Sequence, residues 1–403
     1  MTNTSIQKPF FHPFLSAFVL APETLPFTDK EIIEFDQELS EYEQIFLNPD
    51  VEKSLISRNE LLTSFAISKA ENSQLTLKEA QDVYNLVISD LNYNFISEKL
   101  KTHKKLTQKD HDKLEFFNIV KTFRTLNQKP LSAADLTPHF LRSVHQQLTQ
   151  GLDVFADFLP DFTPYKSGGW RNNDLIRVGS YMPAPHIQIE TGAAELLRWL
   201  IKHFTVTGVA IFHTALYALH PFNNGNKRVC RVLEHLLLRS LGLNAKNLYS
   251  TSYYYHKQKL RYYKYLLYSL ERKNLNHFVS FILEALTLSI VSVVKTSLEV
   301  KRSEFLGRQN LEGQMKTALQ PLIKHQEVQF KNLFRHARKK MARQTLVTYL
   351  QKATEQGTLT KRESGRTTYY SFKFNAPETE TLKRWLDVTG KRLAYIPDEI
   401  RLA

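Results

Sequence analysis

Apolar residues recur at helical spacing through most of this 403-residue chain, and this pattern constrains its fold more than any other feature. Clear examples are the stretches Glu31 to Phe46, Glu60 to Ala70, Leu77 to Ile88 and Phe116 to Leu126. An apolar content of 42% is enough for two or three buried cores. We find no repeat of fixed period and no segment of low complexity. The sequence therefore predicts a mainly α protein.

Two interruptions of the helical pattern stand out in the middle of the chain. Asp161 to Pro185 collects prolines, glycines and asparagines, which favour turns, so we expect a long ordered loop with a short hairpin. The helical pattern runs from Glu195 to Leu219, breaks at His220 to Asn226 and resumes at Lys227. This order predicts a helix, a loop and a second helix.

The most apolar run, Phe278 to Val294, has nearly the length of a membrane span, but Glu284 interrupts it. We interpret the run as a buried helix and expect no membrane association. Met1 to Pro13 lacks the pattern of a signal peptide. Cys230 is the only cysteine, which excludes an intrachain disulfide and a cysteine-cluster zinc site. These features favour a cytoplasmic protein, and export as an effector is left open.

Residues 220 to 231 read His-Pro-Phe-Asn-Asn-Gly-Asn-Lys-Arg-Val-Cys-Arg, and we call them the motif segment. A glycine followed by Asn, Lys and Arg at the start of a helix offers free N–H groups and positive charge, which suit a phosphate. His220 would stand beside that anion site, where an imidazole of near-neutral pKa can accept a hydroxyl proton. Arg228 and Arg231 lie three residues apart, on one helix face, where both could contact phosphates. Phe222 is expected to turn inward and anchor the loop.

The motif segment resembles the motif of the Fic family, His-x-Phe-x-Asp/Glu-Gly-Asn-Gly/Lys-Arg-x-x-Arg. The resemblance implies a protein adenylyltransferase that moves AMP from ATP to a Ser, Thr or Tyr hydroxyl of a protein target. It assigns the general base to His220 and nucleotide binding to the following residues of the segment: Gly225, Asn226, Lys227, Arg228 and Arg231. The family uses Mg²⁺, which an Asp or Glu holds at the position of Asn224. An amide oxygen is a weaker ligand, so Asn224 is a doubtful metal ligand.

Other interpretations of the motif segment stay open. Lys227 is typical of the Doc branch of the family, whose members act as kinases. The same residues could run AMP removal, with Glu71 orienting a water molecule. The segment could also be a loop between helices with a packed histidine and a solvated basic end. The same His-Pro-Phe triplet occurs at His12 to Phe14, but there no Gly-Asn and no spaced arginines follow it.

Gly169 to Pro185 resembles the stretch of the family that contains a flap, which docks the target backbone beside the base by strand addition. On this resemblance the docking residues are Leu175, Ile176, Val178 and Gly179. Tyr262 and Tyr263 match a tyrosine pair near the adenine pocket of the family. Aromatic residues at helical spacing are more often core residues.

Residues 67 to 77 resemble the inhibitory helix of many family members, Ser/Thr-x-x-x-Glu-Gly/Asn. The resemblance assigns the inhibitory glutamate to Glu71, followed by Asn72, whereas Ile67 occupies the Ser/Thr position and does not fit. Such a carboxylate pairs with the last arginine of the motif, here Arg231, and competes with the ATP γ-phosphate. The alternative is a solvated helical glutamate.

The last quarter of the chain carries most of the excess positive charge. Net charge is +14, and residues 301 to 403 hold 21 Lys and Arg against 10 Asp and Glu. Helices at Phe330 to Ala337 and Arg343 to Gln356, then a hairpin within Thr358 to Phe372, look like a winged helix. Its basic residues predict contact with DNA phosphates: Lys339, Lys340, Arg343, Lys361, Arg362 and Arg366. Docking of a protein, including a DNA-associated protein or a second copy in a homodimer, is the alternative.

These interpretations divide the chain into five parts. We expect a helical N-terminal segment around Glu71 at 1–110, a Fic core at 111–295, a linker at 296–318, a winged helix at 319–375 and an extension at 376–403. The predicted fold is mainly α, with a small hairpin flap and an α+β winged helix. ATP and Mg²⁺ are the expected substrate and cofactor. A binding regulator with a weak active site, acting through the winged helix, is the non-enzymatic alternative.

Overall fold

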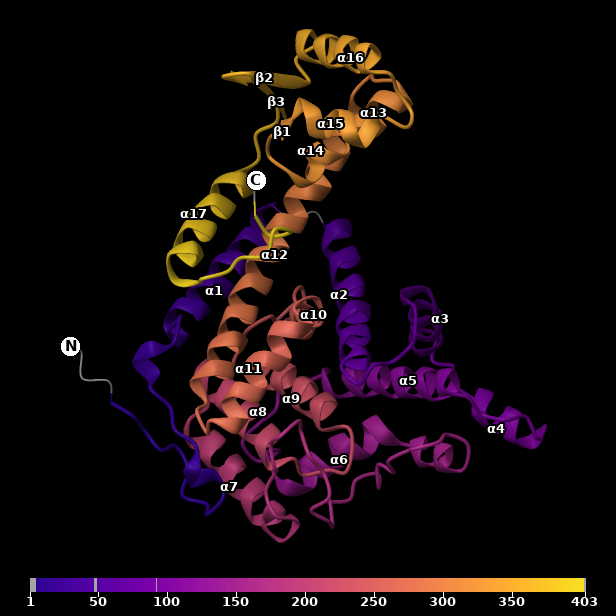
Figure 1. The fold of residues 1–403 in the computed structure, drawn as a ribbon, viewed down its shortest axis with the longest axis vertical. Helices are drawn as coiled ribbons and strands as arrows, with labels where there is room; N and C mark the ends of the chain where they lie inside the picture. The colour runs from indigo at the N-terminus through magenta and orange to yellow at the C-terminus, as the bar shows by residue number, and fades with distance from the viewer. Residues whose placement is uncertain (1–4, 47–48, 92, 402–403) are drawn as a thin grey trace. The chain divides into compact units, whose positions relative to one another are not determined.

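The computed structural model describes residues 5–46, 49–91 and 93–401, and the chain divides into two compact units, Met1–Ser289 and Ile290–Ala403. Helices make up most of the described residues, and the named strands form one three-stranded sheet within the second unit (Figure 1). The mainly α fold predicted from the apolar spacing is confirmed.

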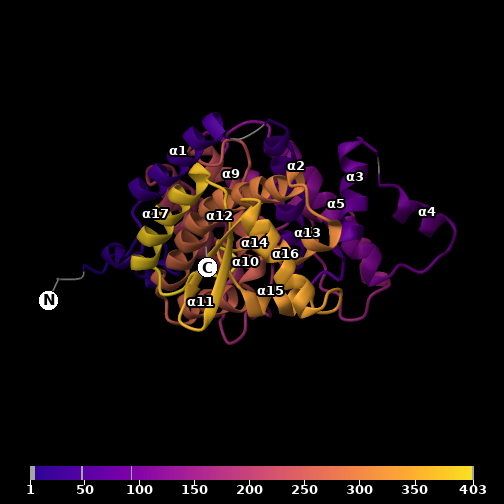
Figure 2. The same cartoon turned by 90° about the horizontal axis from the view of Figure 1, so that it is seen from above.

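The first unit is built from helices. Its α-helices are α1 Asp29–Phe46, α2 Pro49–Lys69, α3 Leu77–Ile88, α4 Phe95–Lys101, α5 Gln108–Leu126, α6 Pro138–Thr149, α7 Ile189–Lys202, α8 Val206–Leu219, α9 Asn226–Ser240, α10 Thr251–Lys257, α11 Lys259–Glu271 and the first part of α12 Asn276–Arg308. Short 3-10 helices lie at Leu15–Ala17, Pro22–Thr24, Leu152–Asp157 and His186–Gln188. Helix α3 packs on α5, and α4 lies at the edge of this unit (Figures 1 and 2).

Helix α8 is the centre of the first unit. Nearly every residue from Val206 to Leu219 is buried, which is expected for a helix that is apolar on all sides. It packs against α7 and α9. Helices α8 and α9 are therefore anchored in the core, so the loop between them has fixed ends.

The predicted helix from Glu195 to Leu219 is two helices. Helix α7 ends at Lys202, and the Oγ1 atom of Thr205 accepts a hydrogen bond of 3.1 Å from the backbone N–H of Gly208 to cap α8. A Cβ atom at Gly208 would lie 1.9 Å from the carbonyl oxygen of His203, so only glycine allows this close corner. The apolar spacing continues across this break, so the sequence pattern predicts a single helix there.

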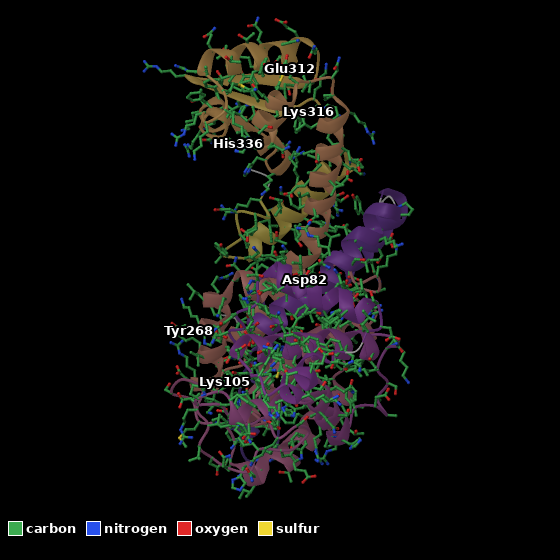
Figure 3. All side chains as sticks on the ribbon, turned by 90° about the vertical axis from the view of Figure 1, so that its right-hand side faces the viewer. Asp82, Lys105, Tyr268, Glu312, Lys316 and His336 are labelled. Carbon is green, nitrogen blue, oxygen red and sulfur yellow. The ribbon has the colours of Figure 1, made fainter. Side chains whose placement is uncertain are left out.

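The second unit combines the rest of α12 with a small α+β fold. Its elements are α13 Gly313–Leu319, α14 Pro321–Lys324, β1 Val328–Gln329, α15 Phe330–Ala337, α16 Arg343–Glu355, β2 Leu359–Ser364, β3 Thr367–Phe372 and α17 Pro377–Arg392. The sheet is antiparallel in the order β1-β3-β2, with Val328 opposite Tyr370. Its buried core includes Leu333, Leu346 and Leu350. Tyr349 of α16 donates a hydrogen bond of 2.6 Å to Glu312, which Figure 3 labels.

This order of helices and strands is consistent with the predicted winged helix, which stays a prediction. The predicted hairpin is present as β2 and β3, and Gly365 in its turn has φ of +58°. The predicted linker, 296–318, is largely helical, because α12 continues to Arg308 and α13 begins at Gly313. The other predicted domain boundaries stay predictions.

Among the described residues, one helix, α12, is long and apolar enough to cross a membrane. However, 83% of its most apolar window is buried within the protein. This burial agrees with our interpretation of Phe278 to Val294 as a core helix.

Candidate active site

A cavity of about 370 Å³ in the first unit brings together segments that are far apart in the sequence. The turn after α2 contributes Glu71, and the loop before α7 contributes Val178 and Gly179. The other lining residues come from the end of α8, the motif segment and α11: Tyr217, His220, Asn223, Asn224, Gly225, Asn226, Lys227, Tyr263, Leu266 and Leu267, with Arg177 at the flap. The structure thus groups His220 with the predicted anion site, Glu71, part of the flap and one of the two predicted tyrosines.

His220 occupies an unusual backbone position at the end of α8. Its φ of +51° and ψ of +62° lie in the left-handed region, which costs a residue with a side chain about 1 kcal/mol or more. Pro221 follows and cannot continue the helix. Strain of this kind persists only where the surrounding structure imposes it, and here it turns the imidazole to line the cavity.

The imidazole of His220 is held in its neutral form. Burial, together with the nearby guanidinium of Arg171, lowers the pKa of His220 to about 3, although the charge of Glu71 opposes the shift. The near-neutral pKa expected from sequence is therefore wrong for the free protein, because the ring is 8% exposed and lies next to cations. A neutral ring at pH 7 can accept a proton, which a base requires.

The loop between α8 and α9 is fixed by Asn226 and Phe222. The Nδ2 atom of Asn226 donates to the carbonyl oxygen of Phe222 at 2.8 Å, and Oδ1 accepts from the Phe222 N–H at 3.0 Å. The Phe222 ring is fully buried and stacks on His145 with centroids 3.9 Å apart, which confirms its predicted anchor role. Both polar atoms of the Asn226 side chain are thus hydrogen-bonded within the loop. Only the backbone N–H of Asn226 is left to contact an anion.

Helix α9 begins with an open N-terminus on the cavity. Gly225 is the N-cap residue with φ of +82°, a conformation that favours glycine. Its N–H donates to Oδ1 of Asn224 at 2.7 Å, and among the described residues no side chain caps the helix. The backbone N–H groups of the first turn therefore point to the cavity end of the helix, where the dipole attracts an anion.

Lys227 and Glu71 form an ion pair within this cavity. Their Nζ and Oε2 atoms are 3.1 Å apart, and about a fifth of each side chain is exposed. Burial acts to raise the pKa of Glu71, but the charges of Lys227 and Arg228 and the hydrogen bond from Lys227 outweigh it and hold that pKa below its ordinary value. Glu71 lies in the turn after α2, not within a helix, and it contacts Lys227 where the resemblance implied Arg231.

Arg228 and Arg231 do not line the cavity. Arg228 is fully buried and pairs with Glu115 of α5 at 2.8 Å, so it fastens α9 to α5, and its predicted contact with a phosphate stays a prediction. Arg231 donates to the carbonyl oxygen of Ala66 at 3.1 Å and lies over the ring of Tyr262, 4.5 Å from its centroid. The carboxylate of Glu115 and the carbonyl oxygen of Ala66 hold the two guanidinium groups on the buried side of α9.

Of the two predicted tyrosines, one is buried in the core and the other lines the cavity. Tyr262 is fully buried and packs in the core, as is common for aromatic residues at helical spacing. Tyr263 lines the cavity, its hydroxyl donates to the carbonyl oxygen of Ala70 at 2.9 Å, and Lys227 lies 5.2 Å from its ring centroid. Tyr263 therefore links α11 to the turn that carries Glu71.

The predicted flap is a tight turn and not a pair of strands. Val178 and Tyr181 exchange backbone hydrogen bonds of 3.1 and 3.0 Å, and Gly179 between them has φ of +60°. Val178 and Gly179 line the cavity, whereas Leu175 and Ile176 do not, and Leu175 is 85% exposed. The stretch leading to the turn belongs to no named strand, so docking of a target by strand addition stays a prediction.

Arg171 connects this loop to the motif segment, and our site predictions did not include it. Its side chain is 1% exposed and donates to the carbonyl oxygens of His220 at 3.1 Å and Ala184 at 2.5 Å, and also to that of Asn173. The Arg171 N–H also donates to the carbonyl oxygen of Pro221 at 2.8 Å. An arginine within a loop rich in glycine and asparagine was the available signal, because such loops need side-chain donors for their carbonyls.

The residues present do not fit a resident Mg²⁺ ion. Within the described ranges, no group of three or more His, Cys, Asp or Glu side chains is placed to hold a metal. Oδ1 of Asn224 is neutral and already accepts the Gly225 N–H. The carboxylate of Glu71 is paired with Lys227.

The predicted DNA-binding residues of the second unit fall into two groups. Lys339 and Lys340 are exposed in the turn before α16, and Arg343 is exposed at the first residue of that helix. On the hairpin, Lys361 pairs with Glu363 at 2.6 Å and Arg362 with Glu327 at 2.5 Å, while Arg366 is exposed in the turn. The group Lys339, Lys340 and Arg343 is therefore better able to bind DNA phosphates, because Lys361 and Arg362 are already paired with carboxylates.

Comparison with known proteins gives the following similarities. Residues 135–238 match the model of the Fic/DOC family. Over 79 residues, 19% of this chain, the sequence is 33% identical to a protein of Aquifex aeolicus named "Probable protein adenylyltransferase", of which the match spans 25%. A crystal structure of a Fic family protein from Desulfovibrio desulfuricans is 20% identical, with a TM-score of 0.49, over 87% of this chain and 99% of that one. Fic-1 from C. elegans is 15% identical, with a TM-score of 0.49, over 68% of this chain and 73% of that one.

Proposed function

Because residues 135–238 form a domain of the Fic/DOC family, we propose that this chain transfers AMP from ATP to a hydroxyl group of a protein target. A relative named as a protein adenylyltransferase matches a fifth of the chain, which supports this activity over the other candidates. The finer assignments, namely the residues that act and the control by Glu71, are proposals that depend on the cavity.

One observation carries the proposal: a neutral, strained His220 and the open N-terminus of α9 line the same cavity. A phosphate held by the first-turn N–H groups of α9 would lie within the same 370 Å³ as the imidazole. A base beside a bound phosphate is the arrangement that transfer of a phosphorus group to a hydroxyl requires.

In the proposed reaction, an unprotonated nitrogen of His220 takes the proton of the target hydroxyl. The hydroxyl oxygen forms a bond to the α-phosphorus of ATP, and the bond from that phosphorus to the β-phosphate oxygen breaks to release pyrophosphate. Negative charge grows on the departing group, and the N-terminus of α9 and Lys227 stabilise it. The triphosphate also raises the pKa of His220 toward neutrality, because its charge opposes that of Arg171.

We assign to Glu71 the control of this reaction. Lys227 is the one lysine of the motif segment, and its Nζ atom forms an ion pair with Oε2 of Glu71 at 3.1 Å. ATP phosphates must displace that carboxylate before Lys227 can contact them, so the ion pair opposes productive binding. This ion pair, and not a contact with Arg231, supports the inhibitory role.

Labelling with ATP tests the proposal against its alternatives. Purified protein is incubated with ATP labelled at the α-phosphorus, and in parallel with ATP labelled at the γ-phosphorus. We expect label on protein from α alone, and its loss in His220→Ala. Label from γ alone would identify a kinase, and no label from either would favour a binding protein. His139→Ala, on the exposed face of α6, is the control variant and should keep activity.

A further inference from the structure

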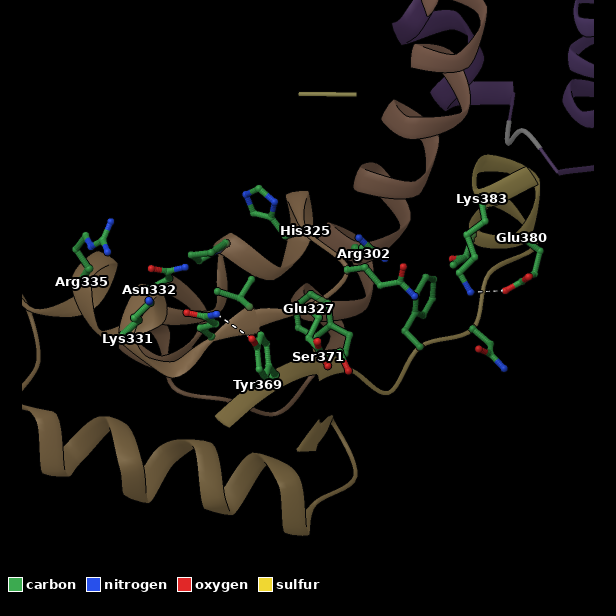
Figure 4. A pocket seen from close by; sticks show the side chains of 18 residues that line it. Arg302, His325, Glu327, Lys331, Asn332, Arg335, Tyr369, Ser371, Glu380 and Lys383 are labelled. Carbon is green, nitrogen blue, oxygen red and sulfur yellow. Dashed lines mark hydrogen bonds and ion pairs between the residues drawn. The ribbon is translucent and has the colours of Figure 1, made fainter. Parts of the chain in front are cut away.

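The cavity of the second unit, of about 1100 Å³, does not bring its charged side chains to one point. Figure 4 shows Lys331 and Arg335 of α15 at one side of it and Arg302 of α12 apart from them. Lys383 of α17 is paired with Glu380 at 2.9 Å. In the first unit, by contrast, side chains from two helices converge on the short segment that carries Glu71.

Residues 70–74 follow the end of α2, and we call them the Glu71 turn. The backbone N–H groups of Ala70, Glu71 and Asn72 each donate to the carbonyl oxygen three residues earlier, at 3.2 to 3.3 Å. Asn72 has φ of +64°, a left-handed conformation that ends the helix. The backbone beyond Asn72 therefore needs contacts other than those of α2 to fix its path.

Two side chains of α11 hold the Glu71 turn. Lys259 donates through Nζ to Oδ1 of Asn72 at 2.8 Å. Tyr263 lies four residues later, on the same face of the helix, and its hydroxyl donates to the carbonyl oxygen of Ala70 at 2.9 Å. Because Ala70 and Asn72 flank Glu71 in the sequence, α11 fixes the chain immediately before and after this glutamate.

A third anchor comes from α5, which also packs against α2. Oδ2 of Asp112 accepts the backbone N–H of Gln74 at 2.5 Å. Oδ1 accepts from Nε2 of Gln108 at 2.7 Å and lies 3.1 Å from Nδ1 of His111. Burial acts to raise the pKa of Asp112, but these hydrogen bonds outweigh it and hold that pKa below its ordinary value. The Glu71 turn is therefore bound by a charged carboxylate, which makes a stronger hydrogen bond than a neutral acceptor.

The three anchors act on the backbone around Glu71 and leave its carboxylate to contact Lys227 at 3.1 Å. Partly exposed ion pairs are usually weak, because two side chains and their backbone must be ordered to form them. A turn that is already fixed loses less conformational entropy when the pair forms. The anchors therefore favour the ion pair, although neither Asp112 nor Lys259 lines the cavity.

We propose that Asp112 and Lys259 are positioning residues for Glu71: they hold Gln74 and Asn72 so that the carboxylate stays on Lys227. This inference rests on the proposed function, in which Glu71 and the ATP phosphates compete for Lys227. Loss of either anchor should free Lys227 and tighten the binding of ATP. Tyr263 also lines the cavity, so its substitution would combine two effects and is not used as a test.

Isothermal titration calorimetry on the full chain tests the proposal with an ATP analogue in which a CH₂ group replaces the oxygen between the α- and β-phosphorus, so that AMP cannot be transferred. We expect Asp112→Asn and Lys259→Ala each to lower the dissociation constant about threefold or more, because a hydrogen bond to the turn is lost. Glu71→Gln should lower it as well. In the Glu71→Gln background neither substitution should tighten binding further, since the carboxylate that they position is gone.

Matched controls separate this role from a general loss of stability. Asp36→Asn changes another buried carboxylate of the first unit, which accepts the backbone N–H of Asn244 at 3.1 Å. Lys264→Ala changes another exposed lysine of α11. Both controls should leave the affinity unchanged. If Asp112→Asn does not fold, Lys259→Ala, at an exposed position, decides the question alone.

The positioning proposal is overturned if neither anchor variant tightens binding, or if the tightening persists in the Glu71→Gln background. If the α-label on protein rises in Glu71→Gly while the anchor variants bind the analogue as wild type does, AMP transfer stands and the positioning role fails. Tightening that depends on Glu71, with no α-label on any variant, would give the reverse result. An analogue that binds to none of the variants would overturn both.

Discussion

Lys227 and Arg228, two neighbouring cations of the motif segment, differ in exposure because they pair with different carboxylates. Lys227 pairs with Glu71 in a cavity where about a fifth of each side chain is exposed. Arg228 pairs with Glu115 where neither side chain is more than 2% exposed. An incoming phosphate can replace a partly exposed carboxylate, but replacing a buried one would strand Glu115 in the core. Of the two, Lys227 is therefore the residue that can leave its ion pair with Glu71 and bind a substrate phosphate.

Replacing Glu71 should activate the protein. We expect Glu71→Gly to raise automodification with α-labelled ATP about tenfold, the effect of removing about 1.4 kcal/mol of competing interaction. Glu71→Gln keeps the size of the side chain but removes its charge, and should give most of the increase. Glu98→Gln, an exposed glutamate outside the cavity, is the control. Equal rates in wild type and Glu71→Gly would remove the inhibitory assignment.

Three buried histidines make stability depend on pH. Burial lowers the pKa values of His145, His220 and His235 to about 3, so the folded protein keeps these rings neutral. The unfolded chain binds protons at pH values below about 6.5, so the stability contribution is complete above that pH and falls as the pH falls. Between pH 6.5 and 5.5, each ring should cost about 1 kcal/mol of unfolding free energy.

Urea unfolding at the two pH values measures this loss, in a range where most carboxylates stay ionised. His235→Phe should reduce the loss by about a third, because this ring packs on Phe123 and the substitution keeps an aromatic group there. An unchanged loss in His235→Phe would show that the histidine does not titrate on unfolding.

At the scale of elements, the candidate site depends on how one loop is attached to one helix pair. Arg171 holds the carbonyl oxygens of His220 and Ala184, so a single side chain ties the flap loop to the end of α8. Its planar group donates in several directions at once, which a lysine cannot do. Residues 178 and 179 then reach the cavity from a loop that has no named strand of its own.

Arg171→Lys should therefore loosen the flap while keeping the positive charge near His220. We expect a lower melting temperature and a rise of about tenfold or more in KM for the protein target, with a smaller change in KM for ATP. Arg142→Lys is the matched control, since Arg142 Nε donates to one carbonyl oxygen, that of Gly168, at 2.7 Å. Equal changes in both KM values would contradict a role in positioning the flap.

At the scale of the whole molecule, charge is divided unevenly between the two units. Of the net charge of +14, an excess of 11 lies in residues 301 to 403. The exposed cluster Lys339, Lys340 and Arg343 has no acidic partner among the described residues, whereas Lys361 and Arg362 do. If the second unit binds DNA, the first cluster should carry most of the binding.

Gel-shift titrations of the full chain with a DNA duplex over a range of salt concentrations test this. We expect the DNA to be retained less as the salt concentration rises. Lys339→Ala/Lys340→Ala should make the plot of log affinity against log salt less steep, by about 1.8. Arg362→Ala, which removes a charge already paired with Glu327, should change it less. An absence of retention at low salt would dismiss DNA and leave protein docking as the role of this surface.

The sequence by itself determined the mainly α fold, the loop between α8 and α9, and the position of His220 at the helix end. These follow from local rules: apolar spacing sets helices, and Pro221 and Gly225 stop and restart them. Even so, the break between α7 and α8 was missed, because it depends on the close approach of Gly208 to the His203 carbonyl, a contact that apolar spacing does not encode.

Only the tertiary structure decided which motif residues face the cavity. Sequence spacing put Arg228 and Arg231 on one face of α9, but the carboxylate of Glu115 and the carbonyl of Ala66 draw that face into the core. The same is true of the His220 pKa, since burial and Arg171 shift it from afar in the sequence. Local spacing fixes which side chains share a face, whereas burial and charge are set by partners that only folding brings near.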